Sequence, residues 1–65
     1  MSNYRVIWYK LPDNLIGGPY RLNVLNSLGQ VVSACGGMPN RAWAERRANQ
    51  YADSFRTLDV SEVRV

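Results

Sequence analysis

The sequence predicts a small α+β fold, a single domain over residues 1–65, with one helix packed on one face of a three- or four-stranded, mainly antiparallel sheet. Three observations lead to this prediction. Only residues 40–55 show sustained helical periodicity. The other apolar segments are short and rich in β-branched and aromatic residues. Clusters of Gly, Pro, Asn and Asp separate them, so the chain order is β-β-β-α-β.

The first half of the chain contains three predicted strands. They are residues 3–11, 20–26 and 30–35. A turn-rich segment over residues 12–19 connects the first two, and a short hairpin turn over residues 26–29 connects the next two. We therefore expect an antiparallel meander, which Gly36-Gly37-Met38-Pro39 ends before the helix begins.

The helix should begin after Asn40, whose side-chain oxygen can accept a hydrogen bond from an unpaired backbone N–H. Its apolar stripe consists of Ala44, Ala48, Tyr51, Ala52 and Phe55. Because three of these residues are alanine, the helix can lie close to the sheet. Residues 60–65 alternate and form a last strand, while the strand order and the direction of its pairing stay open.

Composition limits the classes of function. The net charge of +3 comes from Lys10 and seven arginines, which favours nucleic acid, an acidic protein surface or anionic lipid as partner. The alternative is that the arginines only solvate the surface. Cys35 is the single cysteine and excludes an internal disulfide, and the apolar run Val6–Tyr9 is far too short for a secretory or membrane-spanning segment. We therefore expect a cytoplasmic protein of a bacterial host cell with no membrane partner.

No pattern in the sequence indicates catalysis. The five acidic residues are scattered, histidine is absent, and the pairs Gly17-Gly18 and Gly36-Gly37 lack the lysine of a phosphate loop. Cys35 has no histidine to activate it. We expect no enzymatic activity, no cofactor and no bound metal.

The residues without an evident role in the core cluster in the first half of the helix. They are Arg41, Trp43, Arg46 and Arg47. Trp43 lies off the alanine stripe and either covers the margin of the core or is exposed, with Arg47 as an i+4 neighbour that can stack on its ring. Trp and Arg are enriched among residues that dominate binding energies. In a nucleic-acid interface, the strand aromatics Tyr4, Trp8, Tyr9 and Tyr20 would be available to stack bases.

One resemblance concerns the C-terminal half. It is carried by Ala44, Ala48, Gln50, Tyr51, Phe55, Val60, Val63 and Arg64. This pattern resembles the small inhibitor of bacterial RNA polymerase found in T7-type bacteriophages. The resemblance implies a small sheet with one helix, and it implies that Arg64 contacts the polymerase, with Glu62 where that family has a second arginine. It also suggests a broader class of small phage accessory proteins, which includes anti-CRISPR proteins.

Two hypotheses about function follow. The first is a non-enzymatic protein-binding module, a phage-encoded inhibitor that blocks a host nucleic-acid machine, either RNA polymerase or a CRISPR effector, by occupying its surface. The residues predicted to bind this host protein or nucleoprotein complex are Arg41, Trp43, Arg46, Arg47 and Arg64. The alternative is a small basic DNA- or RNA-binding protein whose helix arginines contact phosphates. In either case an exposed edge strand would allow a homodimer.

Overall fold

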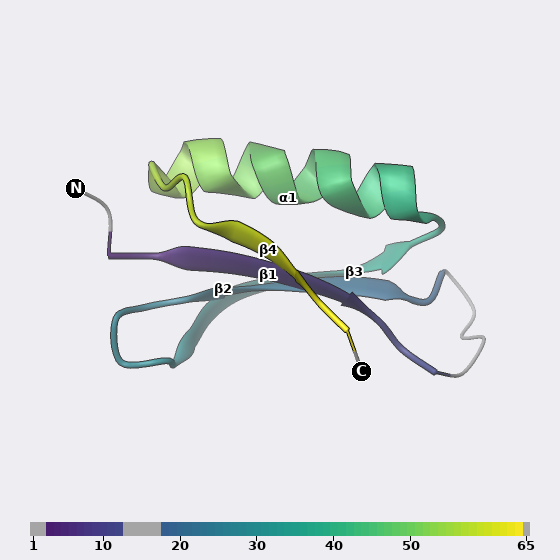
Figure 1. The fold of residues 1–65 in the computed structure, drawn as a ribbon, viewed down its shortest axis with the longest axis horizontal. Coiled ribbons are helices and arrows are strands. Elements are labelled where there is room, and N and C mark those ends of the chain that lie inside the picture. Colours follow the sequence, from purple (N-terminus) through teal and green to yellow (C-terminus); the bar gives the residue numbers. More distant parts are fainter. Residues whose placement is uncertain (1–2, 13–17, 65) are drawn as a thin grey trace.

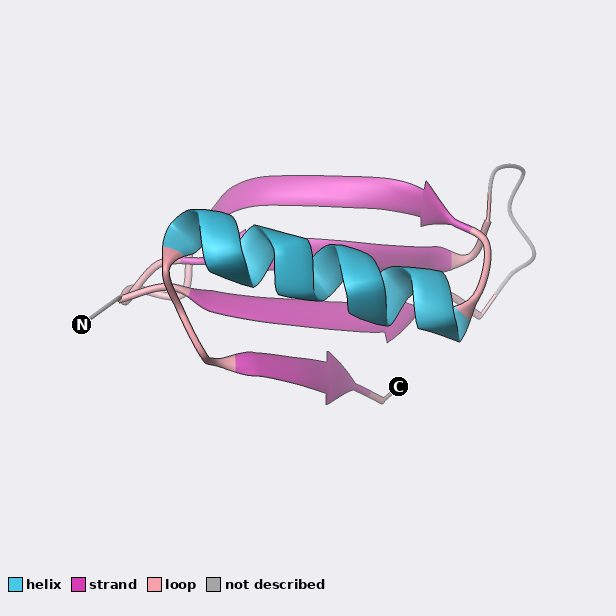
Figure 2. Ribbon diagram, turned by 90° about the horizontal axis from the view of Figure 1, so that it is seen from above, coloured by secondary structure: helices cyan, strands magenta, loops and turns pink. Residues whose placement is uncertain are grey.

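The computed structural model describes residues 3–12 and 18–64 of the chain. These residues form β1 (Arg5–Lys10), β2 (Tyr20–Leu25), β3 (Val31–Met38), α1 (Arg41–Phe55) and β4 (Val60–Val63) (Figure 1). The sheet order is β3-β2-β1-β4, and α1 lies across one face of the sheet (Figure 2). The predicted α+β fold, with its element order β-β-β-α-β, is confirmed. The predicted loop over residues 12–19 lies largely outside the described residues.

The sheet is mixed rather than purely antiparallel. β1 pairs antiparallel with β2, and β2 pairs antiparallel with β3, as the predicted meander requires. β4 pairs parallel with β1. The chain path explains why β4 runs parallel to β1. After β3, α1 runs back along the sheet, so β4 starts at the same end as β1 (Figure 1). β1 thus occupies a central position, with β2 on one side and β4 on the other.

The core lies between α1 and the face of the sheet that α1 covers. Alternation along the two central strands turns Val6, Trp8, Leu22 and Val24 toward the helix, and all four are buried. Alternate residues of β1, such as Tyr9, point to the opposite face of the sheet and are half-buried. In the described part of the chain, no helix or strand covers that opposite face (Figure 1).

β3 continues beyond the predicted end, and the expectation that Gly36-Gly37 breaks the sheet is wrong. The register passes from Leu22↔Cys35 to Tyr20↔Met38, so the two glycines together face a single residue of β2, which is Arg21. This is a β-bulge. Gly37 has a φ of 75°, and a Cβ on Gly36 would lie 2.7 Å from the Arg21 side chain. The glycines therefore keep the strand in the sheet as far as Met38, which is buried.

α1 begins at the predicted N-cap and packs its predicted stripe on the sheet. The Asn40 side chain accepts a hydrogen bond from the backbone N–H of Trp43 at 2.8 Å, which confirms the predicted N-cap. The buried stripe consists of Ala44, Ala48 and Ala52, with Tyr51 and Phe55 packed at the margin of the core. Arg56 ends the helix in the left-handed conformation, with a φ of 55°.

Thr57 joins α1, β1 and β4. It is the buried polar residue of the described chain, 8% exposed. Its hydroxyl donates a hydrogen bond to the Tyr4 carbonyl at 2.6 Å and accepts one from the Asp59 backbone N–H at 3.1 Å. Nearby, Arg5 forms an ion pair with Asp59 at 3.2 Å. These contacts align the start of β4 with the start of β1.

Candidate functional site

The five residues predicted to bind a partner form two groups around α1. Arg41 and Arg64 border a hollow at one end of the sheet. Trp43, Arg46 and Arg47 do not line this hollow. Helix geometry explains the separation, since each residue advances by about 100° and Trp43 therefore lies about 200° from Arg41 around the helix axis. Residues that are neighbours in the sequence thus belong to two different surfaces.

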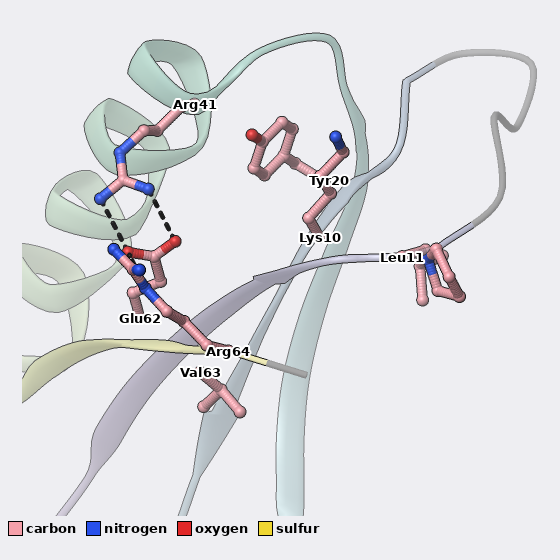
Figure 3. A pocket seen from close by; sticks show the side chains of 8 residues that line it. Lys10, Leu11, Tyr20, Arg41, Glu62, Val63 and Arg64 are labelled. Carbon is pink, nitrogen blue, oxygen red and sulfur yellow. Dashed lines mark hydrogen bonds and ion pairs between the residues drawn. The ribbon is translucent and has the colours of Figure 1, made fainter.

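The hollow opens where several elements meet. It has a volume of about 470 Å³ and lies where β1 and β4 end, where β2 begins, and beside the first turn of α1 (Figure 3). It is lined by Lys10, Leu11, Pro12, Tyr20, Arg41, Glu62, Val63 and Arg64. We call this site the basic hollow, because three of its lining side chains are positively charged.

Arg41 is engaged in the fold, so the interpretation that it has no structural role is wrong. Its Nη1 and Nη2 atoms donate to the two carboxylate oxygens of Glu62 at 2.8 and 2.7 Å, a bidentate contact between α1 and β4 (Figure 3). The guanidinium carbon lies 5.2 Å from the ring centroid of Trp8. The hydrogen bonds with Glu62, together with its negative charge, raise the pKa of the Arg41 guanidinium.

The other two cations of the basic hollow are held more loosely. Arg64 Nε lies 3.8 Å from Glu62 Oε1, and the Arg64 side chain is 80% exposed. Lys10 is exposed at the end of β1, and no described carboxylate lies within ion-pair distance of it. The described lining therefore carries three positive side chains and one carboxylate. Two cations remain available to an anion from solution.

Sequence reasoning missed Lys10, Tyr20 and Glu62 as members of this site. For Lys10 and Tyr20 the signal was only approximate, because pairing the two predicted strands symmetrically about residues 12–19 sets Leu11 opposite Tyr20, one position away from the observed pair of Lys10 and Tyr20. Glu62 could not be found in this way. Its position depends on the parallel pairing of β4 with β1, which alternation alone does not encode.

Trp43, Arg46 and Arg47 form the second surface, which we call the helix flank. Trp43 is 44% exposed, Arg46 is exposed and Arg47 is half-buried. Their spacing of three and four residues places them on one side of α1. No described carboxylate lies within ion-pair distance of either arginine. The predicted stacking of Arg47 on Trp43 is absent from the described residues, where the arginine that lies over a ring is Arg41, on Trp8.

The aromatic residues of the strands do not form one stacking surface. Trp8 is buried under α1, and Tyr4 packs edge-on against Phe55 with ring centroids 5.0 Å apart. Tyr9 lies on the opposite face of the sheet. Tyr20 borders the basic hollow, 6.3 Å from Trp8 between ring centroids. Bases could therefore not stack on all four rings at once.

The remaining side chains offer little chemistry in the described part of the chain. Over residues 3–12 and 18–64, no group of three His, Cys, Asp or Glu residues could hold a metal ion. Cys35 is a half-buried free thiol whose Sγ donates a weak hydrogen bond to the Gly36 carbonyl at 3.9 Å. Burial raises the pKa of Tyr51, and the Cys35 thiol adds to this effect. Within the same described ranges, no helix has the length and hydropathy of a membrane span.

Comparison with known proteins adds no further constraint. No protein-family model matches the chain, and no curated protein or solved structure matches it either. The class of the protein is therefore defined by its own fold and surfaces. It is a small α+β protein with one helix on a four-stranded mixed sheet, and it carries a basic hollow on one side of the helix and an arginine- and tryptophan-containing flank on the other.

Proposed function

We propose that this chain is a non-enzymatic protein-binding module and that the helix flank is its contact surface. The observation that carries the proposal is Trp43, a large aromatic side chain that is 44% exposed beside two arginines with no ion-pair partner among the described residues. Leaving such a side chain in water gives up roughly 1–2 kcal/mol of burial free energy. Tryptophan and arginine together are typical of residues that dominate the energy of protein interfaces.

The charge of the flank indicates the kind of partner. Arg46 and Arg47 contribute two of the eight positive charges behind the net charge of +3, and no described carboxylate lies within ion-pair distance of either. An acidic protein surface complements them and would accelerate association through electrostatic steering. The resemblance of the C-terminal half to the phage inhibitor makes bacterial RNA polymerase the first partner to test, and a CRISPR effector the second. The contact proposed here differs from the one that the resemblance implies, because it uses the helix flank and not Arg64, which lines the basic hollow.

Two double variants with equal charge changes test the proposal. The Arg46→Gln/Arg47→Gln variant alters the helix flank, and the Lys10→Gln/Arg64→Gln variant removes the same charge from the basic hollow. Each is immobilised and exposed to purified bacterial RNA polymerase and to bacterial lysate. We expect the flank variant to lose capture at least tenfold and the hollow variant to retain it. Equal losses would show that only net charge matters and would refute the flank as the contact.

Trp43→Ala provides a second, uncharged test. A tryptophan at the centre of an interface contributes more than about 2 kcal/mol, which corresponds to at least thirtyfold in affinity. Because Trp43 is outside the buried core, its removal should leave the urea midpoint of the free protein nearly unchanged. Unchanged capture by Trp43→Ala would remove this residue from the contact surface.

The second candidate function is direct DNA or RNA binding. It is favoured by the same observation that no described carboxylate neutralises Arg46 or Arg47, since free arginines suit phosphates as well as carboxylates. Binding to random DNA and RNA, measured by fluorescence anisotropy, should then fall steeply as salt increases. An absence of binding at low salt would exclude this function.

A further inference from the structure

We propose that the basic hollow binds a small phosphate ester, with the phosphate on Lys10, Arg41 and Arg64 and the organic part on the apolar wall of the hollow. This inference does not rest on the proposed function, because it involves none of the side chains of the helix flank. It assigns a second, separate site to the same chain.

The first argument is the positive charge that three elements bring to the lining of one hollow. Lys10 comes from the end of β1, Arg41 from the start of α1 and Arg64 from the end of β4, and all three line one hollow (Figure 3). The described lining contains one opposing carboxylate, Glu62, which leaves a net charge of +2. A phosphate monoester carries between one and two negative charges at neutral pH and has three oxygens that can each accept from a different cation.

The second argument is the place of the hollow in the fold. β1 and β4 run parallel and end at it, and α1 begins beside it. In open α/β sheets, ligands bind outside the carboxyl ends of parallel strands. The hollow lies outside the ends of the one parallel pair in the described sheet, and the N-terminus of α1 adds positive potential to that of the side chains. The first turn of α1 contains no acidic residue that would neutralise this potential.

Glu62 explains how the site stays formed without a ligand. Its carboxylate holds the Arg41 guanidinium in a bidentate contact and lies 3.8 Å from Arg64 Nε. The cations are thereby kept close together, which reduces the ordering cost when a ligand binds. The same carboxylate also repels an incoming anion, so removing its charge should strengthen phosphate binding.

The apolar wall indicates that the ligand is an ester rather than free phosphate. Leu11, Pro12, Val63 and the ring of Tyr20 form the apolar part of the lining of the hollow, which we call its apolar wall. Free phosphate is too small to use this wall, while a flat or apolar body attached to the phosphate would cover it. The polar groups would then fix the orientation, as is usual in small-molecule sites.

The test is an NMR titration of the ¹⁵N-labelled full chain with inorganic phosphate and with phenyl phosphate, at low and constant ionic strength. We expect saturable shifts at the backbone amides of Lys10, Arg41 and Val63. Phenyl phosphate should bind at least threefold more tightly than inorganic phosphate. Equal affinities would overturn the assignment of an ester, and the absence of saturable shifts up to about 20 mM phenyl phosphate would overturn the site.

Variants separate the site from general attraction of anions to a basic protein. Glu62→Gln keeps one acceptor for Arg41 and should tighten phenyl phosphate binding about three- to tenfold. Lys10→Gln/Arg64→Gln should weaken it at least fivefold. Arg46→Gln is the matched control, an exposed arginine outside the hollow, and should bind like the wild type. If Arg46→Gln weakens binding as much as Arg64→Gln, or if Glu62→Gln fails to tighten it, the inference is wrong.

The two proposals can fail independently. The Lys10→Gln/Arg64→Gln variant should lose phenyl phosphate binding and retain capture of a protein partner. Arg46→Gln/Arg47→Gln should show the reverse. If the chain captures no protein partner but its amide resonances shift with phenyl phosphate as predicted, the phosphate site in the basic hollow stands and only the proposed role of the helix flank is refuted.

Discussion

Replacing Thr57 with valine removes one hydroxyl from the junction of α1, β1 and β4 and preserves the shape of the side chain. Thr57 is 8% exposed, so the methyl group that replaces the hydroxyl stays buried and creates no cavity. What is lost is the hydrogen bond to the Tyr4 carbonyl at 2.6 Å and the one from the Asp59 backbone N–H at 3.1 Å. The backbone partners stay in place without the hydroxyl that satisfied them.

The expected loss of stability follows from these two bonds. A hydrogen bond contributes a net 0.5–1.5 kcal/mol, roughly, so two give a loss of about 1–3 kcal/mol in the free energy of unfolding. The free energy of unfolding of a chain of 65 residues is small. Each kcal/mol lost from it lowers the melting temperature of so short a domain by about 4–8 °C. Urea unfolding followed by circular dichroism measures the change directly, provided that the slope with denaturant is the same in both proteins.

Thr57→Ser is the matched control for this experiment. Serine keeps the hydroxyl and loses one methyl group, which should cost no more than about 1 kcal/mol. The Asp59 amide should exchange its hydrogen faster in Thr57→Val and at the wild-type rate in Thr57→Ser. If Thr57→Val is as stable as the wild type, or more stable than Thr57→Ser, the junction does not depend on the hydroxyl and the reasoning fails.

Three further predictions concern other parts of the fold. Gly18→Ala should cost more than about 2 kcal/mol, because its Cβ would lie 2.4 Å from the Met38 carbonyl oxygen at a φ of 104°. Gly29→Ala, with a φ of 80° and open space around its Cβ, should cost only about 1 kcal/mol, and urea midpoints that rank the two the other way would contradict the steric argument. Ala48→Leu should destabilise the protein by about 1–3 kcal/mol, measured in the same way, since Ala48 is fully buried where α1 meets the sheet. Burial raises the pKa of Tyr51 above 10.0, so the folded state holds this proton more tightly than the unfolded state does. Stability should therefore fall as the pH rises above about 10, and Tyr51→Phe should reduce that fall in urea titrations between pH 8 and pH 11.

Local chemistry made α1 the most predictable part of the molecule. Asn40 as N-cap and the spacing of Ala44, Ala48 and Ala52 involve only neighbours in the sequence, and the structure agrees with both. The end of β3 was missed for a physical reason. A Gly-Gly pair serves equally well to stop a strand and to form a bulge, and the register against Arg21 decides between the two.

The candidate site was only half predictable because its geometry depends on contacts between distant segments. Spacing along α1 groups Trp43 with Arg47 and sets Arg41 apart from them, but it does not say what Arg41 contacts. Arg41 meets Glu62, 21 positions later, since β4 returns parallel to β1. Pairing direction is a property of the whole chain path and leaves no trace in the alternation of a short strand.

The central position of β1 has a consequence for the order in which the protein can be made. β1 leaves the ribosome first, yet its second edge stays unpaired until β4 emerges, and its contacts with the β4 junction span 53 and 54 positions. At roughly 5–20 residues per second, translation leaves that edge open for about 3–10 s. During this interval the nascent meander presents a free strand edge that another chain could occupy. The length of the delay, rather than the stability of the finished fold, should therefore govern how much of the protein aggregates during synthesis.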